Sequence, residues 1–73
     1  MATEVTASLT ANVWKITTKV GDEIEEDDEI MILESMKMEM PVESPCDGKI
    51  IEFKVNEGDT VNEGDVLCLI EDS

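Results

Sequence analysis

One lysine of the chain lies in an unusual setting: Lys37 stands between Met36 and Met38, in the stretch Glu34-Ser35-Met36-Lys37-Met38. A deprotonated lysine amine is a nucleophile, although a lysine at an exposed turn is most often only a solubilising charge. Flexible, polarizable methionines on both sides place apolar surface where water is expected, which costs solubility unless a partner recognises it. The pattern therefore indicates that a partner protein recognises the region around Lys37.

Other chemistries have little support. The chain has no His, so it offers no imidazole for a metal site or for a Ser- or Cys-based catalytic pair. Its two cysteines, Cys46 and Cys68, are expected to be free thiols in the core or in loops. No signal peptide is recognisable at residues 1–4, and no stretch approaches the roughly 20 apolar residues of a membrane helix. These features predict a protein of the reducing cytoplasm.

The charge balance excludes two classes of partner. Nineteen acidic residues against five lysines and no arginine give a net charge of −14, which argues against nucleic acid and against an anionic membrane surface. Seven of the eight residues in 22–29 are acidic. Their spacing does not fit the EF-hand calcium loop with its central glycine, so we expect a solvated loop that steers the chain toward basic partner surfaces. No metal site is predicted.

The chain is expected to form a single all-β domain over residues 1–73, because it is too short for two cores. Ile, Val and Thr together number 20 and Ala only 3, which favours strands. Residues 22–40 lack Gly and Pro, but their apolar residues do not repeat every three to four positions, so a helix is not predicted there. The expected strands are Val13–Ile16, Ile30–Leu33, Ile50–Val55 and Val66–Ile70.

An internal repeat organises these strands. Residues 13–35 match residues 50–72 at an offset of about 37, with Gly21 on Gly58 and Asp22 on Asp59. Two copies of one strand-turn-strand unit suggest a fold with pseudo-twofold symmetry, in which each half covers the apolar face of the other. Lys37 falls at the junction of the copies, where a hairpin tip is expected. The symmetry places this tip at one end of the domain and both termini near the other.

Residues 34–38 resemble the attachment hairpin of the biotinyl/lipoyl attachment domain family. Biotin-accepting members typically show Ala-Met-Lys-Met there, and Ser35 stands in place of the alanine. The turns at Gly21-Asp22, Gly58-Asp59 and Gly64-Asp65 are similar to the family's too, and the likeness is closest to its short stand-alone bacterial members. The resemblance implies a flattened barrel-sandwich of two four-stranded antiparallel sheets, with the attachment lysine on the hairpin between the fourth and fifth strands.

The resemblance also implies a function. Lys37 would accept biotin from a biotin protein ligase by attacking the activated carboxylate, and the ligase would recognise Glu34, Ser35, Met36 and Met38 around it. The attached cofactor would carry a carboxyl group from a biotin carboxylase to a carboxyltransferase. The chain itself would be a carrier and not an enzyme, because the cofactor supplies the chemistry.

Two alternatives remain open at the level of the sequence. The first is a lipoyl carrier, or one that takes both biotin and lipoate, in which a lipoate ligase modifies Lys37 for a 2-oxoacid dehydrogenase or related complex. Met36 and Met38 favour biotin over this reading, because lipoyl members more often have Asp before the lysine. The second alternative is an unmodified acidic binding module, in which Lys37 is only a surface charge.

Overall fold

The computed structural model describes residues 2–72 as strands and turns without a helix. No helix long and apolar enough to cross a membrane is therefore found in that part of the chain. The strands, and the lack of any helix among residues 2–72, confirm the predicted all-β class. The eight strands are β1 (Ala2–Thr6), β2 (Ala11–Ile16), β3 (Glu23–Ile24), β4 (Glu29–Ser35), β5 (Met38–Glu43), β6 (Gly48–Phe53), β7 (Thr60–Val61) and β8 (Val66–Asp72).

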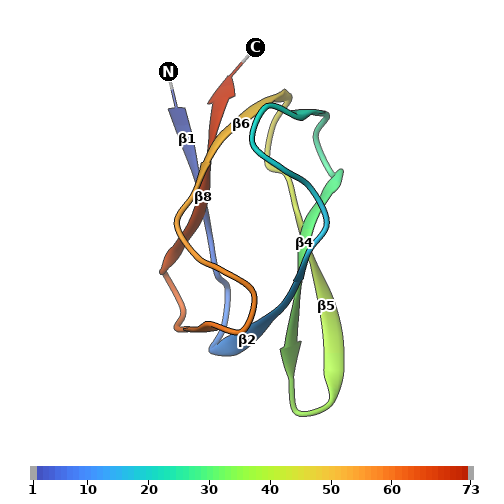
Figure 1. Cartoon of the computed structure of the whole chain (residues 1–73), viewed down its shortest axis with the longest axis vertical. Helices are drawn as coiled ribbons and strands as arrows, with labels where there is room; N and C mark the ends of the chain where they lie inside the picture. The colour runs from blue at the N-terminus through green and yellow to red at the C-terminus, as the bar shows by residue number, and fades with distance from the viewer. Residues whose placement is uncertain (1, 73) are drawn as a thin grey trace.

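The strands form two four-stranded antiparallel sheets that face each other across the core (Figure 1). One sheet has the order β1-β8-β6-β3 and the other the order β5-β4-β2-β7. Adding 37 to the residue numbers of β2, β3 and β4 gives the bounds of β6, β7 and β8, and β1 falls in the same way on residues 39–43 of β5. The two sheet orders then correspond strand by strand, which is the pseudo-twofold relation that the repeat predicts.

Strand alternation divides the side chains between core and solvent. In β2 the side chains of Ala11 and Val13 are buried, while those of Asn12 and Trp14 are exposed. The buried apolar residues of both sheets make one cluster, which is almost wholly aliphatic because the chain has only one Phe and one Trp. The fully buried members with the largest side chains are Ile30, Met31, Leu33, Ile50, Leu67 and Ile70.

Four turns of one type connect the strands. In each, an aspartate carboxylate accepts a hydrogen bond from a backbone N–H three residues earlier, at 2.8–3.0 Å, and the aspartate N–H donates back to that residue's carbonyl oxygen. This reciprocal bonding satisfies backbone groups that no strand partner reaches. The residue before each aspartate has positive φ. The four pairs are Gly21-Asp22, Asp27-Asp28, Gly58-Asp59 and Gly64-Asp65.

Asp27 is the exception among these turns, because it is the only one of the four positive-φ residues that is not glycine. Its φ is 75°, and that of its repeat counterpart Gly64 is 90°. We expect Asp27→Gly to raise the free energy of unfolding by about 0.5–1 kcal/mol, since a Cβ is unfavourable in the left-handed region. Urea unfolding followed by circular dichroism measures the change. The reverse substitution, Gly64→Asp, should destabilise, and a loss of stability in Asp27→Gly would contradict this account.

Candidate functional site

The hairpin that joins the two repeats ends in a two-residue loop made of Met36 and Lys37. Strands β4 and β5 pair as far as Ser35 and Met38, which lie opposite each other. The φ angles of Met36 and Lys37 are 53° and 66°, as the two central residues of a type I′ turn require. Such turns usually contain Asn and Gly, and other residues adopt left-handed φ at a cost. The paired strands on both sides therefore impose this backbone on Met36 and Lys37.

The loop lies at the far end of the molecule from the two termini, as the repeat predicts (Figure 1). Lys37 is exposed, and within residues 2–72 its amine makes no ion pair and no side-chain hydrogen bond. Met36 is 92% exposed and Met38 65% exposed. The structure thus presents a free primary amine between two apolar side chains on a narrow tip.

The five residues singled out by the sequence lie together in this one hairpin. Glu34 and Ser35 are the last two residues of β4 and are half-buried. Strict alternation would have put Met36, Met38 and Met40 on one face, but the turn intervenes. Met38 and Met40 share a face of β5, where Met40 lies opposite the buried Leu33, whereas Met36 belongs to the loop.

Two of the other lysines differ from Lys37 in having partners. The amine of Lys15 lies 5.6 Å from the ring centroid of Trp14, a distance at which a cation–π attraction operates. The amine of Lys54 lies 3.1 Å from a carboxylate oxygen of Glu52. Lys37 is set apart by its place in a hairpin loop and by the apolar residues around it.

Both cysteines are free, as expected. Burial raises the pKa of Cys68 to about 11. Burial also raises the pKa of the half-buried Cys46, which a hydrogen bond with Thr3 lowers and the neighbouring Asp72 raises further. Both shifts disfavour the nucleophilic thiolate form. Cys46 lies at the opposite end of the molecule from the Lys37 loop, with its Sγ 3.5 Å from an oxygen of Asp72.

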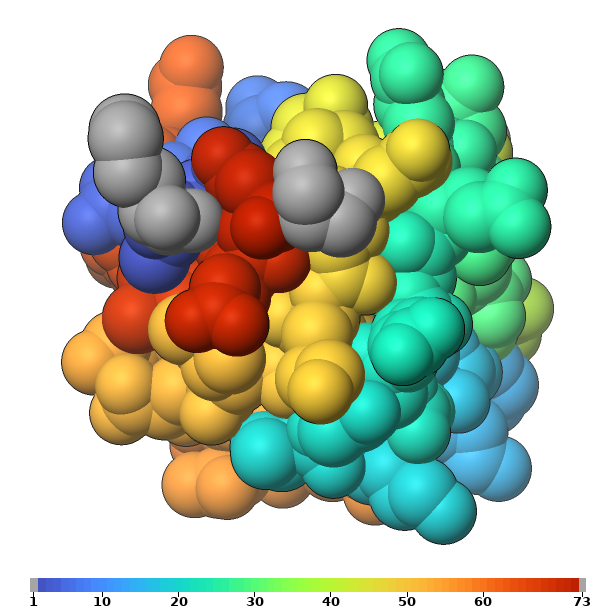
Figure 2. Space-filling view, turned by 90° about the horizontal axis from the view of Figure 1, so that it is seen from above, coloured from blue at the N-terminus to red at the C-terminus, as the bar shows by residue number. Residues whose placement is uncertain are grey.

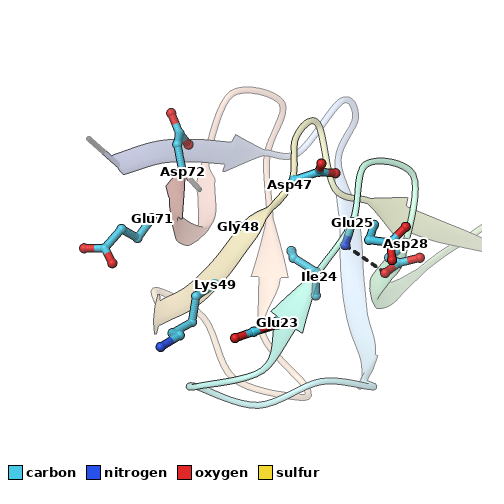
Figure 3. Close-up of a pocket in the computed structure, with 9 residues that line it drawn as sticks. All are labelled: Glu23, Ile24, Glu25, Asp28, Asp47, Gly48, Lys49, Glu71 and Asp72. Carbon is cyan, nitrogen blue, oxygen red and sulfur yellow. Dashed lines mark hydrogen bonds between the residues drawn. The ribbon is translucent and has the colours of Figure 1, made fainter.

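Figure 2 looks onto the end that carries the termini, where six carboxylates surround one crevice: Glu23, Glu25, Asp28, Asp47, Glu71 and Asp72. This crevice, of about 630 Å³, lies between the 23–28 segment, the start of β6 and the end of β8. Asp28 accepts a hydrogen bond from the Glu25 N–H, whereas Glu71 and Asp72 point away from this pair (Figure 3). No group of three or more potential ligands within residues 2–72 could hold a metal ion. The acidic segment 22–29 forms turns, the short strand β3 and the start of β4.

Comparison with known proteins places this geometry in a family. The model of the biotin/lipoyl family, described as "Biotin-requiring enzyme", matches residues 1–70. The "Biotin/lipoyl attachment protein" of Bacillus subtilis is 48% identical over 69 residues, which are 94% of either chain.

Two solved structures show the same fold, one within a much longer chain and one in a chain of similar length. The urea carboxylase of Kluyveromyces lactis contains a region that superposes with a TM-score of 0.92 at 34% identity, over 97% of this chain and 6% of that one. The lipoyl domain of the 2-oxoglutarate dehydrogenase complex from Azotobacter vinelandii superposes with a TM-score of 0.71 at 35% identity, over 88% of this chain and 82% of that one. From the family match over residues 1–70 and these likenesses, the chain belongs to the biotinyl/lipoyl attachment domain family, as a carrier rather than an enzyme.

Proposed function

We propose that the chain is a covalent biotin carrier, a single domain over residues 1–73, and that Lys37 is its attachment site. The observation that carries this proposal is the loop itself. Lys37 occupies a two-residue turn with left-handed backbone, between exposed methionines, on the tip farthest from the termini. The match to a family described as "Biotin-requiring enzyme" and the similarity to a "Biotin/lipoyl attachment protein" support biotin as the cofactor.

Attachment requires Lys37 to act as a nucleophile. A biotin protein ligase would offer the carboxylate as an acyl-adenylate, which the lysine nitrogen attacks. The new amide C–N bond forms as the bond to AMP breaks, and the nitrogen loses its proton to the ligase. Only the unprotonated amine is a nucleophile, so the ligase must also accept the proton of any ammonium form before the attack.

The hairpin contributes position to this step. Strand pairing up to Ser35 and Met38 holds the two loop residues in one backbone conformation, which reduces the entropy lost when the amine docks in the ligase. Met36 and Met38 offer apolar contact on either side of the amine, and Glu34 and Ser35 complete the surface that we propose the ligase recognises. Each of these residues would contribute to selecting Lys37 among the five lysines of the chain.

The carrier role extends to two further partners. Bound biotin would accept a carboxyl group at a biotin carboxylase and give it up at a carboxyltransferase. The test is to offer the biotinylated chain to a biotin carboxylase with bicarbonate and ATP, beside free biotin at equal concentration. Faster carboxylation of the attached biotin is expected, because the biotin carboxylase would bind the protein domain as well as the biotin ring. Equal rates would contradict the carrier role while leaving attachment intact.

Two free cysteines support a reducing, cytoplasmic setting for these reactions.

Replacing Met38 by leucine is expected to lower kcat/KM for biotinylation by about two- to fivefold. The variant loses thioether contacts worth about 0.5–1 kcal/mol with the ligase, while the side chain stays apolar. Steady-state labelling kinetics measure the effect. Met40→Leu is the matched control, because Met40 lies two residues away on the same face of β5 but is half-buried opposite Leu33, whereas Met38 is exposed. If both variants behave like the wild type, Met38 is not part of the recognised surface.

A lipoyl carrier is the second candidate, and one observation favours it. The likeness to the lipoyl domain from Azotobacter vinelandii covers 88% of this chain at 35% identity, and lipoyl attachment uses the same amine on the same kind of hairpin. A lipoate ligase would then modify Lys37. Comparing kcat/KM for the two ligases on the purified chain ranks the candidates, and comparable values would indicate a carrier for both cofactors.

A further inference from the structure

The outer face of the sheet that carries the Lys37 hairpin bears an apolar residue on each of three neighbouring strands. On β4, Ile32 lies between the buried Met31 and Leu33 and therefore points outward. Its cross-strand partner on β5 is Pro41, and its partner on β2 is Lys15, directly after Trp14. A bulge at Trp14 places both Trp14 and Lys15 on the outer face. We name Trp14, Ile32 and Pro41 the outer stripe.

Carboxylates border the outer stripe on both sides. On the hairpin side, Glu34 pairs with Glu39 across β4 and β5, and on the other side Glu29 pairs with Glu43. Like charges directly opposite each other destabilise a sheet, so this arrangement is costly for the free chain. An apolar centre with an aromatic anchor and a charged rim is the composition of a protein–protein interface.

The second sheet offers an internal comparison, because the repeat builds both faces from the same strands. The repeat counterparts of Trp14, Ile32 and Pro41 are Ile51, Leu69 and Glu4, 37 residues away in each case. A carboxylate thus takes the place of Pro41 on the edge strand of that face, and no aromatic residue takes the place of Trp14. All three positions are apolar only on the sheet that bears Lys37.

We propose that the outer stripe docks on the biotin protein ligase that modifies Lys37, against an apolar patch bordered by Lys or Arg side chains. This inference rests on the proposed function and deepens it. Charge complementarity identifies the partner's chemistry: four rim glutamates and a net charge of −14 match a basic surface. The stripe and the loop belong to the same sheet, so one partner can contact both at once (Figure 1).

Trp14→Ala tests the aromatic anchor, and Ile51→Ala is its matched control on the opposite sheet. With a purified biotin protein ligase, biotin and ATP, Trp14→Ala is expected to raise the KM for the carrier about tenfold with little change in kcat. Trp14→Phe should restore most of the affinity. Thermal unfolding followed by circular dichroism checks that each variant is folded. Equal KM values for Trp14→Ala and Ile51→Ala would overturn the proposal.

A second pair of variants tests the glutamates that border the outer stripe. Glu43 lies on the border farther from Lys37, so Glu43→Lys alters docking without touching the loop. We expect it to raise KM and to weaken the dependence of KM on salt, whereas Glu4→Lys, on the edge strand of the other sheet, should do neither. Equal effects of the two would overturn the proposed face.

Failure of this inference and failure of the proposed function give different results. A wild-type chain that the ligase does not label refutes the proposed function itself. A wild-type chain that is labelled, with the same KM as Trp14→Ala, refutes only the docking surface. Sedimentation of the unmodified chain tests whether a second copy of the chain occupies the outer stripe instead. A dimer that Trp14→Ala dissociates, while the KM for the ligase stays unchanged, would assign the outer stripe to that second copy and overturn the proposal.

Discussion

Replacing Lys37 by arginine is expected to abolish labelling by the ligase, although the charge and the hairpin are preserved. The guanidinium stays protonated and is a poor nucleophile, so no amide forms. The other four lysines remain as internal controls, and they differ from Lys37 in their setting: Lys15 lies against Trp14 and Lys54 pairs with Glu52. Labelling measured by streptavidin blot should fall to background.

The double variant Met36→Lys/Lys37→Met makes this prediction sharper. It keeps an exposed lysine in the same two-residue loop but moves the amine by one position. A displacement of about 1 Å from the productive geometry can cost about a hundredfold in rate, so a reduction of at least that size is expected. If the moved lysine is labelled as fast as Lys37, the ligase selects any exposed amine on the tip. The geometry of position 37 would then have no special role.

The second large effect concerns stability. Gly48→Ala is expected to lower the free energy of unfolding by about 3 kcal/mol, at the upper end for an overpacked site. A Cβ at Gly48 would lie 2.3 Å from the backbone oxygen of Glu71 and 2.6 Å from Cγ2 of Ile70. Relief requires β8 to move away from β6, which disturbs the core at Ile70. Urea unfolding followed by circular dichroism gives the difference.

The repeat supplies the control for this substitution. The counterpart of Gly48 is Ala11, at the start of β2, where the chain already carries a Cβ. Ala11→Gly should cost only about 0.5–1 kcal/mol, chiefly through the entropy of the unfolded chain. A Gly48→Ala variant within about 0.5 kcal/mol of the wild type would show that strands β6 and β8 are not held as closely at Gly48 as described.

Much of the fold follows from the sequence because the two halves repeat. Apolar alternation and the repeat locate β2, β4, β6 and β8, the hairpin junction and the end of the molecule that carries Lys37, but they predict no separate strand over β5. Strand β1 escapes the same reasoning because Val5 is its one buried residue, and the two-residue strands β3 and β7 are too short for any period. At the same offset residues 2–6 correspond to residues 39–43 of β5, but only Val5 and Val42 match, so the repeat alone does not reveal β1.

The candidate site, too, could be predicted from the sequence only in part. The residue types around Lys37 identify the hairpin, but the left-handed φ of Met36 and Lys37 depends on strand pairing that residue types alone do not specify. The outer stripe is hidden for a related reason. Trp14, Ile32 and Pro41 are far apart in the chain and lie on one face of the sheet only through the pairing of three strands. The bulge at Trp14 shifts the pairing of β2 with β4 by one residue.

Intact mass of the wild-type chain, after expression with a biotin protein ligase and separately with a lipoate ligase, tests the central claim most directly. The account predicts one biotinyl increment per chain, lost in Lys37→Arg. A lipoyl increment alone would replace biotin by lipoate, and increments from both ligases would indicate a carrier for both. A chain that gains mass from neither ligase would contradict covalent attachment, and the acidic binding module would then be the better account.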